Sequence, residues 1–388
     1  MTDSSAGMSP ATLSLEKTDI FEEGQDGFAC YRIPGVVVTA SGVALAYCEA
    51  RKFTCADRGE IEIHLRRSVD GCRTWEPARQ IAHIGPRLPR NPHMSEEKRR
   101  KNMGGPDEQT VNNPVAIAGR DGTTHFVYCV EYMRCFTMRS DDDGLTWSKP
   151  VEITYAFDQF RSDCDWQVIA TGPGHGIQLR GGRLVVPVWL ADYREDAAIK
   201  RAASVILSDD AGVTWRRGEI AVLDSTECIV AELTDGRVML SARNSHPCCR
   251  RAVTFSPDGV SGWSEPEFAE DLLEPGCMAS LLSLPGTPET KKPFLLFSNP
   301  HTTDRPHRDR RDLTVQLSRD NGRTWPVRKL LQPGPSAYSD LAVLPDETIL
   351  CFYECGRPEA SRRHGRPWAY GCLTLVRFDL EWLLEGKD

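Results

Sequence analysis

Short apolar segments alternate with turn-forming residues along most of the chain. Strand-like patterns occur at Ile61–Arg66, Phe136–Met138 and Leu313–Leu317, where apolar and polar residues alternate or strand formers cluster. Stretches with helical periodicity are scarce, whereas 31 Gly and 26 Pro residues are scattered through the 388 residues. This pattern predicts an all-β protein.

One short motif, Ser-x-Asp-x-Gly-x-Thr-Trp, recurs along the chain. The motif is complete at Ser140–Trp147, Ser208–Trp215 and Ser318–Trp325. It is nearly complete at Ser68–Trp75, where Cys72 replaces the glycine, and it is degenerate at Ser256–Trp263. Ser and Asp side chains can bond nearby backbone amides, Gly permits a positive φ, and Trp can pack on the adjoining hairpin. Each copy is therefore expected to be a structural hairpin corner away from any substrate.

The spacing of these motifs predicts the architecture. Copies recur about every 60 residues, so six four-stranded units fit the chain, which favours a six-bladed β-propeller. We expect a single domain over 16–388, a disordered N-terminus over 1–15, and a short C-terminal helix within Phe378–Leu384. The polar segment Gly85–Gly105 is expected to be a solvated loop, with a lid over a site as the alternative.

Composition and charge exclude several classes of function. The net charge of −8 argues against broad nucleic-acid binding, and no apolar run approaches the roughly 20 residues of a membrane span. The first residues contain no apolar stretch of signal-peptide length, so we expect a cytoplasmic protein with mostly reduced cysteines; a secreted form remains open. The 14 cysteines have no metal-ligand spacing, and no metal or other cofactor is expected.

A motif near the start makes the chemistry more specific. Tyr31-Arg32-Ile33-Pro34-Gly35 precedes a strand at Val36–Thr39 and is followed by the repeated motifs. From Tyr31 to about Leu384 the chain resembles the exo-α-sialidase (neuraminidase) family with Asp-box (BNR) repeats. The resemblance implies a retaining glycoside hydrolase with a Tyr nucleophile. Its partners would be sialylated glycans of oligosaccharides, glycoproteins and glycolipids, from which it would remove terminal α-linked sialic acid.

Arginines are the groups that such a substrate requires first. A sialoside carries a carboxylate on its anomeric carbon, and a guanidinium stays charged and offers a planar donor fork to it. By resemblance, the three arginines that bind this carboxylate are Arg32, Arg243 and Arg310. Arg311 remains an alternative to Arg310, because the two are adjacent.

The nucleophile and its base follow from two further segments. A neutral tyrosine avoids the repulsion that a carboxylate nucleophile would meet from the substrate carboxylate, but it needs a base to take its proton. By resemblance, Tyr338 in Ser336–Leu341 is the nucleophile and Glu232 in Cys228–Leu233 is its base. A hairpin turn between Glu232 and Arg243 is expected to bring both side chains to the same end of one blade.

The remaining site residues also rest on the resemblance. Asp57 would be the acid/base that protonates the leaving oxygen. Arg51 would contact a substrate hydroxyl or ring substituent, Glu49 would orient an arginine, and Glu354 would pair with Arg32. Trp189 and, more weakly, Asn113 are candidates for the pocket wall, whereas His175, flanked by glycines, is expected to be structural.

Two alternatives stay open at this stage. The first is a hydrolase of Kdn or another nonulosonic acid, or an enzyme that forms an internal anhydro product or transfers the sugar. The second is a non-catalytic propeller that binds acidic sugars, which would need the arginines but not Tyr338, Glu232 and Asp57 together. Their joint presence favours the enzyme.

Overall fold

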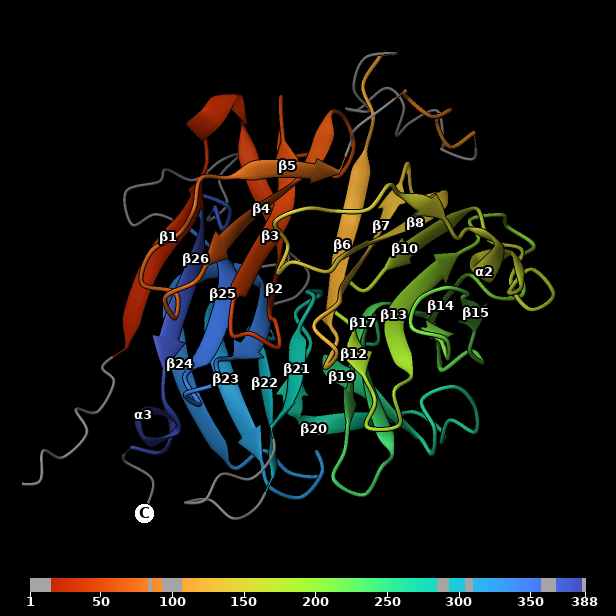
Figure 1. The fold of residues 1–388 in the computed structure, drawn as a ribbon. Helices are drawn as coiled ribbons and strands as arrows, with labels where there is room; N and C mark the ends of the chain where they lie inside the picture. Colours follow the sequence, from red (N-terminus) through yellow and green to blue (C-terminus); the bar gives the residue numbers. More distant parts are fainter. Residues whose placement is uncertain are drawn as a thin grey trace, which may run out of the picture.

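The computed structural model describes residues 15–82, 86–92, 107–284, 293–303, 310–356 and 368–385. The expected disordered segment 1–15 lies almost wholly outside these residues, and so does most of the expected 85–105 loop. The described part is nearly all β, and its sheets are mainly antiparallel and largely follow one another in chain order (Figure 1). None of the helices described in it has the length and apolar character needed to cross a membrane.

The first two sheets are formed by the N-terminal part of the chain. The first has the order β2-β3-β4-β5, with bounds Cys30–Val38, Ala44–Arg51, Ile61–Ser68 and Arg79–Ala82. The second has the order β11-β6-β7-β8-β9, with bounds Gly174–His175, Val111–Ala118, Thr124–Val130, Arg134–Ser140 and Val151–Glu152. Here β11 is parallel to β6, whereas the other neighbours are antiparallel.

Two further sheets form the middle of the chain. The third has the path β10-β13-β14-β15, with bounds Val168–Thr171, Leu184–Ala191, Arg201–Ser208 and Arg216–Arg217. Two further strands join it: β12 (Ile177–Gln178) pairs with β13, and β16 (Val222–Leu223) pairs with β14. The fourth has the order β17-β18-β19-β20, with bounds Ser225–Glu232, Val238–Asn244, Arg250–Ser256 and Glu267–Leu273. The short helices η1 (Gln25–Gly27) and α2 (Tyr155–Asp158) lie in connections.

The C-terminal part forms one seven-stranded sheet with the order β1-β26-β25-β24-β23-β22-β21. Its bounds are Glu16–Glu22, Cys372–Phe378, Ile349–Cys355, Val327–Val343, Arg311–Ser318, Phe294–Pro300 and Ser280–Leu284. The first half of β24 pairs with β23 and its second half with β25. The N-terminal β1 lies beside β26, which precedes the C-terminal helix α3 (Leu380–Leu384) (Figure 1).

Hydrophobic clusters join each sheet to the next. Leu45 and Ile63 of the first sheet pack with Phe126 of the second, and similar clusters follow between the later sheets. A further cluster combines Phe352 and Leu375 of the last sheet with residues of β2 and β3, including Val36. Apolar contacts therefore connect the last sheet back to the first.

The repeated motifs form the hairpin corners that the sequence predicts. In the second sheet, Ser140 Oγ accepts from Gly144 N at 2.8 Å, and Asp142 accepts from the Thr146 amide (2.8 Å) and hydroxyl (2.6 Å). The same bonds recur in the copies at Ser68–Trp75, Ser208–Trp215 and Ser318–Trp325. Cys72, in the position of the glycine, has a φ of 65°, which shows that this turn imposes the left-handed conformation on a non-glycine residue.

A buried carboxylate ties several sheets together near the centre of the fold. Asp340 of β24 accepts from Val36 N (2.9 Å), His175 Nδ1 (2.7 Å) and Ser280 Oγ (2.9 Å), which belong to β2, β11 and β21. Asp340 is fully buried, and we call this group the Asp340 cluster. His175 lies in this cluster, away from the tyrosine and the arginines of the candidate site.

Candidate active site

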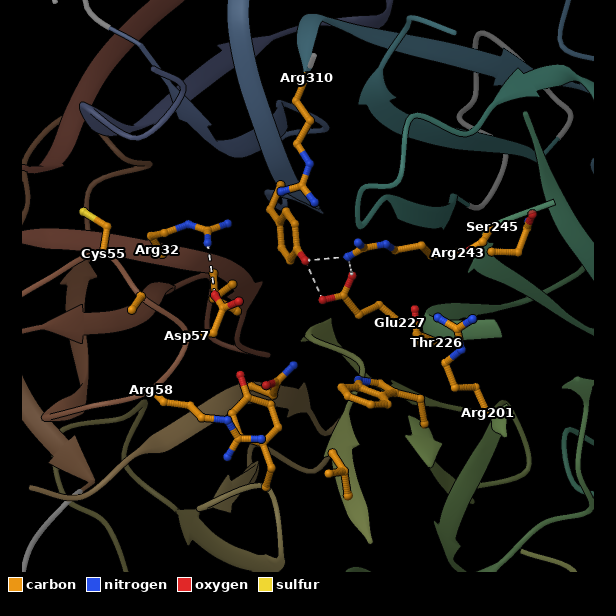
Figure 2. A pocket seen from close by; sticks show the side chains of 18 of the residues that line it. Arg32, Cys55, Asp57, Arg58, Arg201, Thr226, Glu227, Arg243, Ser245 and Arg310 are labelled. Atoms are coloured by element: carbon orange, nitrogen blue, oxygen red, sulfur yellow. Dashed lines mark hydrogen bonds and ion pairs between the residues drawn. The ribbon is translucent and has the colours of Figure 1, made fainter. Parts of the chain in front are cut away.

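A polar pocket of about 640 Å³ collects most of the residues that the sequence singled out. Its lining residues come from the first four sheets and from the seven-stranded sheet, and they include Arg32, Arg51, Asp57, Asn113, Trp189, Glu227, Arg243, Arg310, Tyr338 and Tyr370. Figure 2 shows arginines converging on the centre of this pocket from several directions. Among the residues that the structure describes, no group of three His, Cys, Asp or Glu side chains is arranged to hold a metal ion.

Tyr338 is bonded to a carboxylate and an arginine at the centre of the pocket. Its hydroxyl donates to Glu227 Oε1 at 2.5 Å and accepts from Arg243 Nη1 at 3.0 Å (Figure 2). Arg243 Nη1 also pairs with the second oxygen of Glu227. The three side chains come from β24, β17 and β18, so sheet pairing and sheet packing together set their geometry.

The protonation of this group follows from its surroundings. Burial raises the pKa of the Tyr338 hydroxyl well above its usual value, and the Glu227 carboxylate raises it further. Arg243 and Arg310 oppose the shift without cancelling it. Tyr338 is therefore a neutral phenol in this state, with a carboxylate placed to take its proton.

The expected base, Glu232, is not part of this group. It lies at the other end of β17, opposite Val238, and its carboxylate accepts from Arg180 N at 2.8 Å. The two strands pair antiparallel across the turn, so Arg243 is at the end far from that turn and faces Glu227. The structure corrects the predicted partner of Tyr338 from Glu232 to Glu227. The sequence did contain a signal for Glu227. If Glu232 pairs with Val238 across the predicted turn, counting outward along both strands places Glu227 opposite Arg243.

Arg32 is held by Glu354, as the resemblance implied. Its Nε donates to Glu354 Oε1 at 2.9 Å and its Nη2 to Oε2 at 3.2 Å. The same carboxylate accepts from the amides of Ile33 (3.0 Å) and Tyr338 (3.1 Å), and it is fully buried. Glu354 thus fixes the first arginine and the backbone of the tyrosine together.

Arg310, rather than Arg311, points into the pocket. Its Nη2 donates to Gly276 O at 2.6 Å, and its guanidinium lies 5.2 Å from the centre of the Tyr338 ring. Arg311 begins β23 opposite Pro335 and does not line the pocket. Within the described part of the chain, Arg310 forms no ion pair with a carboxylate, in contrast to Arg32 and Arg243.

Tyr370 is a pocket residue that the sequence analysis did not identify. Its ring lies under the Arg32 guanidinium, 4.0 Å from the ring centre, and its hydroxyl accepts from Arg310 Nη1 at 3.3 Å. Tyr370 therefore contacts two of the three arginines. It follows β25 by many residues and belongs to no recognised motif, so the sequence carried no signal for it.

Asp57 lies in the loop after β3 and bonds two arginines. Its Oδ1 accepts from Arg51 Nη1 at 2.9 Å and from Arg32 Nη1 at 3.3 Å, while 70% of its side chain stays exposed. The surrounding protein atoms disfavour a charged carboxylate, but Arg51 and Arg32 outweigh this effect and hold the pKa of Asp57 well below its usual range. Arg51 is in turn bonded to buried Glu49, at 2.6 and 3.0 Å.

The opposite wall of the pocket is aromatic and polar. Tyr132 occupies the turn between β7 and β8 with a φ of 55°, and the Arg58 guanidinium lies 4.4 Å from its ring centre. Trp189 of β13 and Asn113 of β6 also line the pocket, as the sequence suggested. Tyr132 and Trp189 lie beside each other, with ring centres 6.4 Å apart.

Comparison with known proteins first defines the class of this fold. Residues 56–351 match the family described as BNR repeat-like domain. The matched range contains all five copies of the repeated motif.

Individual relatives then narrow the class. The chain is 32% identical over 352 residues to a sialidase of Bacteroides fragilis (strain YCH46), covering 85% of this chain and 61% of that protein. It is 34% identical over 380 residues to a sialidase of Micromonospora viridifaciens, covering 94% and 54%. It is 30% identical over 405 residues to sialidase-3 of Mus musculus, covering 90% and 93%. The chain belongs to the sialidase family, and it spans less than two thirds of the length of the two bacterial relatives.

Solved structures agree with the fold. The Hadza microbial sialidase Hz136 is 29% identical, with a TM-score of 0.74 over 94% of this chain and 69% of that chain. The intramolecular trans-sialidase from Ruminococcus gnavus has the same TM-score at 18% identity, over 94% and 98%. The second likeness concerns the fold alone.

Proposed function

We propose that this protein is an exo-sialidase that hydrolyses terminal α-linked sialic acid with retention of configuration. The observation that carries the proposal is the contact between Tyr338 and Glu227 inside a pocket lined by Arg32, Arg243 and Arg310. A phenol bonded to a carboxylate is an activated nucleophile, and three guanidinium groups around it suit an anionic sugar.

Binding would begin with the substrate carboxylate. Arg310 forms no carboxylate ion pair within the described residues, and Arg32 and Arg243 keep part of their donor groups directed toward the pocket. A carboxylate among the three would sit beside the Tyr338 ring, which places the attached anomeric carbon near the phenol oxygen. Asp57 accepts a hydrogen bond from Arg32 in this state, and this bond would have to break when the substrate binds.

The first chemical step would form a covalent intermediate. Glu227 takes the Tyr338 proton as the phenol oxygen bonds to the anomeric carbon and the bond to the leaving oxygen breaks. Asp57 gives a proton to that leaving oxygen. The neutral phenol approaches the substrate carboxylate without the repulsion that a carboxylate nucleophile would meet.

The second step would release the sugar. Asp57, now ionised, takes a proton from water, which attacks the anomeric carbon from the face that the leaving group vacated. The bond to Tyr338 breaks, and Glu227 returns the proton to the phenol oxygen. Two inversions at one carbon give net retention.

The low pKa of Asp57 bears on this scheme. Its carboxylate is held ionised by Arg51 and Arg32, whereas a general acid must carry a proton. Loss of the Arg32 contact to the incoming substrate carboxylate would remove part of that stabilisation and raise the pKa of Asp57. Substrate binding would thus favour the protonated form of Asp57, which the general acid requires.

We also propose that the sheets are the six blades of a β-propeller. The long β24 divides the seven-stranded sheet into two groups of four, β21 to β24 and β24 with β25, β26 and β1. With the four other sheets this gives six units, and apolar clusters join the last to the first. The pocket would then lie at one end of the propeller axis.

A fluorescent sialoside tests the proposed function. We expect wild-type protein to release methylumbelliferone from its N-acetylneuraminic acid glycoside between pH 4 and 8, and Tyr338→Phe to lose nearly all turnover while still binding a sialic-acid-like inhibitor. Proton NMR should show the α-anomer of the free sugar first. Release of the β-anomer first, or more than a few per cent activity in Tyr338→Phe, would remove Tyr338 as nucleophile. Wild-type inactivity would redirect the test to Kdn glycosides and then to glycan binding alone.

A further inference from the structure

Six of the cysteines form three neighbouring pairs. The first is Cys30 with Cys55, whose Sγ lies 3.9 Å from the carbonyl oxygen of Ala29, the residue before Cys30; the others are Cys129 with Cys135 and Cys355 with Cys372. The last two pairs stand directly opposite each other across antiparallel strands. Directly opposed residues have Cα atoms about 4.5 or 5.5 Å apart, which lies within the range that a disulfide spans.

The first pair differs because it links the candidate acid/base loop to the strand of the first arginine. Cys30 begins β2, two residues before Arg32. Cys55 lies in the loop after β3, two residues before Asp57, with its Sγ 3.9 Å from Ala29 O. The Cys55 carbonyl accepts from Arg51 Nη1 at 2.8 Å, the same nitrogen that donates to Asp57. A bond between these two sulfurs would therefore act on the position of Asp57.

Access distinguishes the first pair from the others. Cys55 is partly exposed and lines the pocket, so a small reagent in the pocket can reach its sulfur. Cys129 and Cys135 are both fully buried. Cys355 and Cys372 are also buried, with 7% and 4% exposure, and neither lines the pocket.

We propose that Cys30 and Cys55 form an oxidisable dithiol site whose disulfide fixes the Asp57 loop to β2. With a peroxide as oxidant, the Cys55 sulfur takes one oxygen to become a sulfenic acid, and one water is released. The Cys30 sulfur then attacks that sulfur, the S–O bond breaks, and the hydroxyl leaves as water with the Cys30 proton. Two thiols and one hydrogen peroxide thus give one disulfide and two waters.

The order of these steps follows from the burial of Cys30. Burial and the neighbouring Cys55 raise the pKa of the Cys30 thiol well above its usual value, so it is a poor target for the oxidant itself. Cys55, at the pocket surface, is the sulfur that meets the reagent first. Cys30 then acts as the resolving thiol, because Cys55 Sγ lies beside its backbone.

The consequence for turnover rests on the proposed function. Cys55 lies beside Cys30 in the state where Asp57 is bonded to Arg32 and Arg51. A disulfide would hold the loop near this state, whereas catalysis requires Asp57 to release Arg32 and reach the leaving oxygen. Oxidation should therefore lower kcat, and a thiol reductant should restore it.

Peptide mapping tests the site directly. The full chain is treated with hydrogen peroxide under native conditions, thiols are then blocked, and cross-linked peptides are identified by mass. We expect a Cys30–Cys55 cross-link to form first, to be absent in Cys30→Ser and to form normally in Cys355→Ser, the matched control. Oxidised Cys55 without cross-linking to Cys30, or earlier cross-linking of Cys355 to Cys372, would overturn the proposal.

Turnover before and after oxidation tests the effect on the loop. Wild-type and Cys355→Ser proteins should lose activity severalfold and recover with dithiothreitol, whereas Cys30→Ser should not show this reversible loss. A complete cross-link with unchanged kcat would overturn the claim that it controls the loop. If the reduced protein turns over no sialoside, the proposed function fails. The mass of the cross-linked peptides still shows whether the Cys30–Cys55 disulfide forms.

Discussion

Tyr338 and Asp340 stand two residues apart on β24, yet each belongs to a different kind of polar cluster. The Asp340 carboxylate receives three donors, from a backbone amide, a hydroxyl and an imidazole, and it is fully buried. Around Tyr338 there are three arginines, of which Arg310 forms no ion pair with a carboxylate among the described residues. The charge of Asp340 is met by three hydrogen-bond donors inside the protein, whereas the arginines around Tyr338 keep donor groups directed at a pocket.

The difference shows how one strand can serve stability and chemistry together. A buried charge is tolerated when hydrogen bonds replace the water it has lost, as they do for Asp340. The arginines around Tyr338 repel one another, and an anionic ligand bound among them would offset this unfavourable electrostatic energy. We therefore expect changes in the Asp340 cluster to affect unfolding and changes around Tyr338 to affect turnover.

Replacing Glu227, the proposed base, should separate the effects of the two clusters most clearly. Glu227→Gln keeps the shape of the side chain but cannot take the Tyr338 proton, so kcat should fall by roughly 10²–10⁴. Glu232→Gln, on the same strand, is the matched control and should retain near wild-type kcat; an equal loss in both variants would contradict the assignment of Glu227.

Removing the charge of the Asp340 cluster should have the opposite effect. Asp340→Asn leaves His175 without its anionic partner and should lower the free energy of unfolding by about 3–5 kcal/mol. Denaturant unfolding followed by tryptophan fluorescence measures this loss. Turnover per folded molecule should fall far less than in Glu227→Gln, and an unchanged unfolding midpoint would show that the cluster is not a structural one.

The His175 side of the same cluster predicts a dependence on pH. Burial lowers the pKa of His175, but Asp340 raises it more, so the net pKa is above the ordinary value near 6.5. This raised pKa gives stability that is fully present below about pH 6.5 and is lost as pH rises through the folded-state pKa. The melting temperatures of wild type and His175→Gln should therefore converge as pH rises from 6 to 9. A constant or widening difference would contradict this.

The smallest expected effect belongs to Tyr370. Tyr370→Phe removes the hydroxyl that accepts from Arg310 but keeps the ring under Arg32, at a cost of about 0.5–1.5 kcal/mol. KM for the sialoside should rise severalfold with little change in kcat, because the contact acts through the arginines. Tyr370→Leu, which also removes the ring, should raise KM further. A fall in kcat alone would contradict a positioning role.

Local chemistry made much of the fold predictable from the sequence. Each repeated motif closes its own turn with its own side chains, as at Ser140 and Asp142, so distant residues do not affect the prediction. Arg32, Asp57 and Tyr338 were found because each lies in a segment that resembles the family. The roles of these residues remain predictions.

Glu227, the proposed base, was missed because its position depends on pairing rather than on a local pattern. Glu227 and Glu232 lie on the same strand, and only the register with β18 decides which one faces Arg243. The strand also has an irregularity between Ser225 and Cys228, beside Glu227. Tyr370 depends on packing between segments far apart in the chain, which no short motif records.

The pairing of β1 with β26 has a consequence for how the protein is made. Arg377 bonds Glu16 across 361 residues of chain, so β1 is synthesised long before its partner β26. At 5–20 residues per second, the first strand would wait roughly 20–70 s for its partner on the ribosome. During this interval the nascent chain carries an unpaired strand, which is an opportunity for mispairing that chaperones would have to cover.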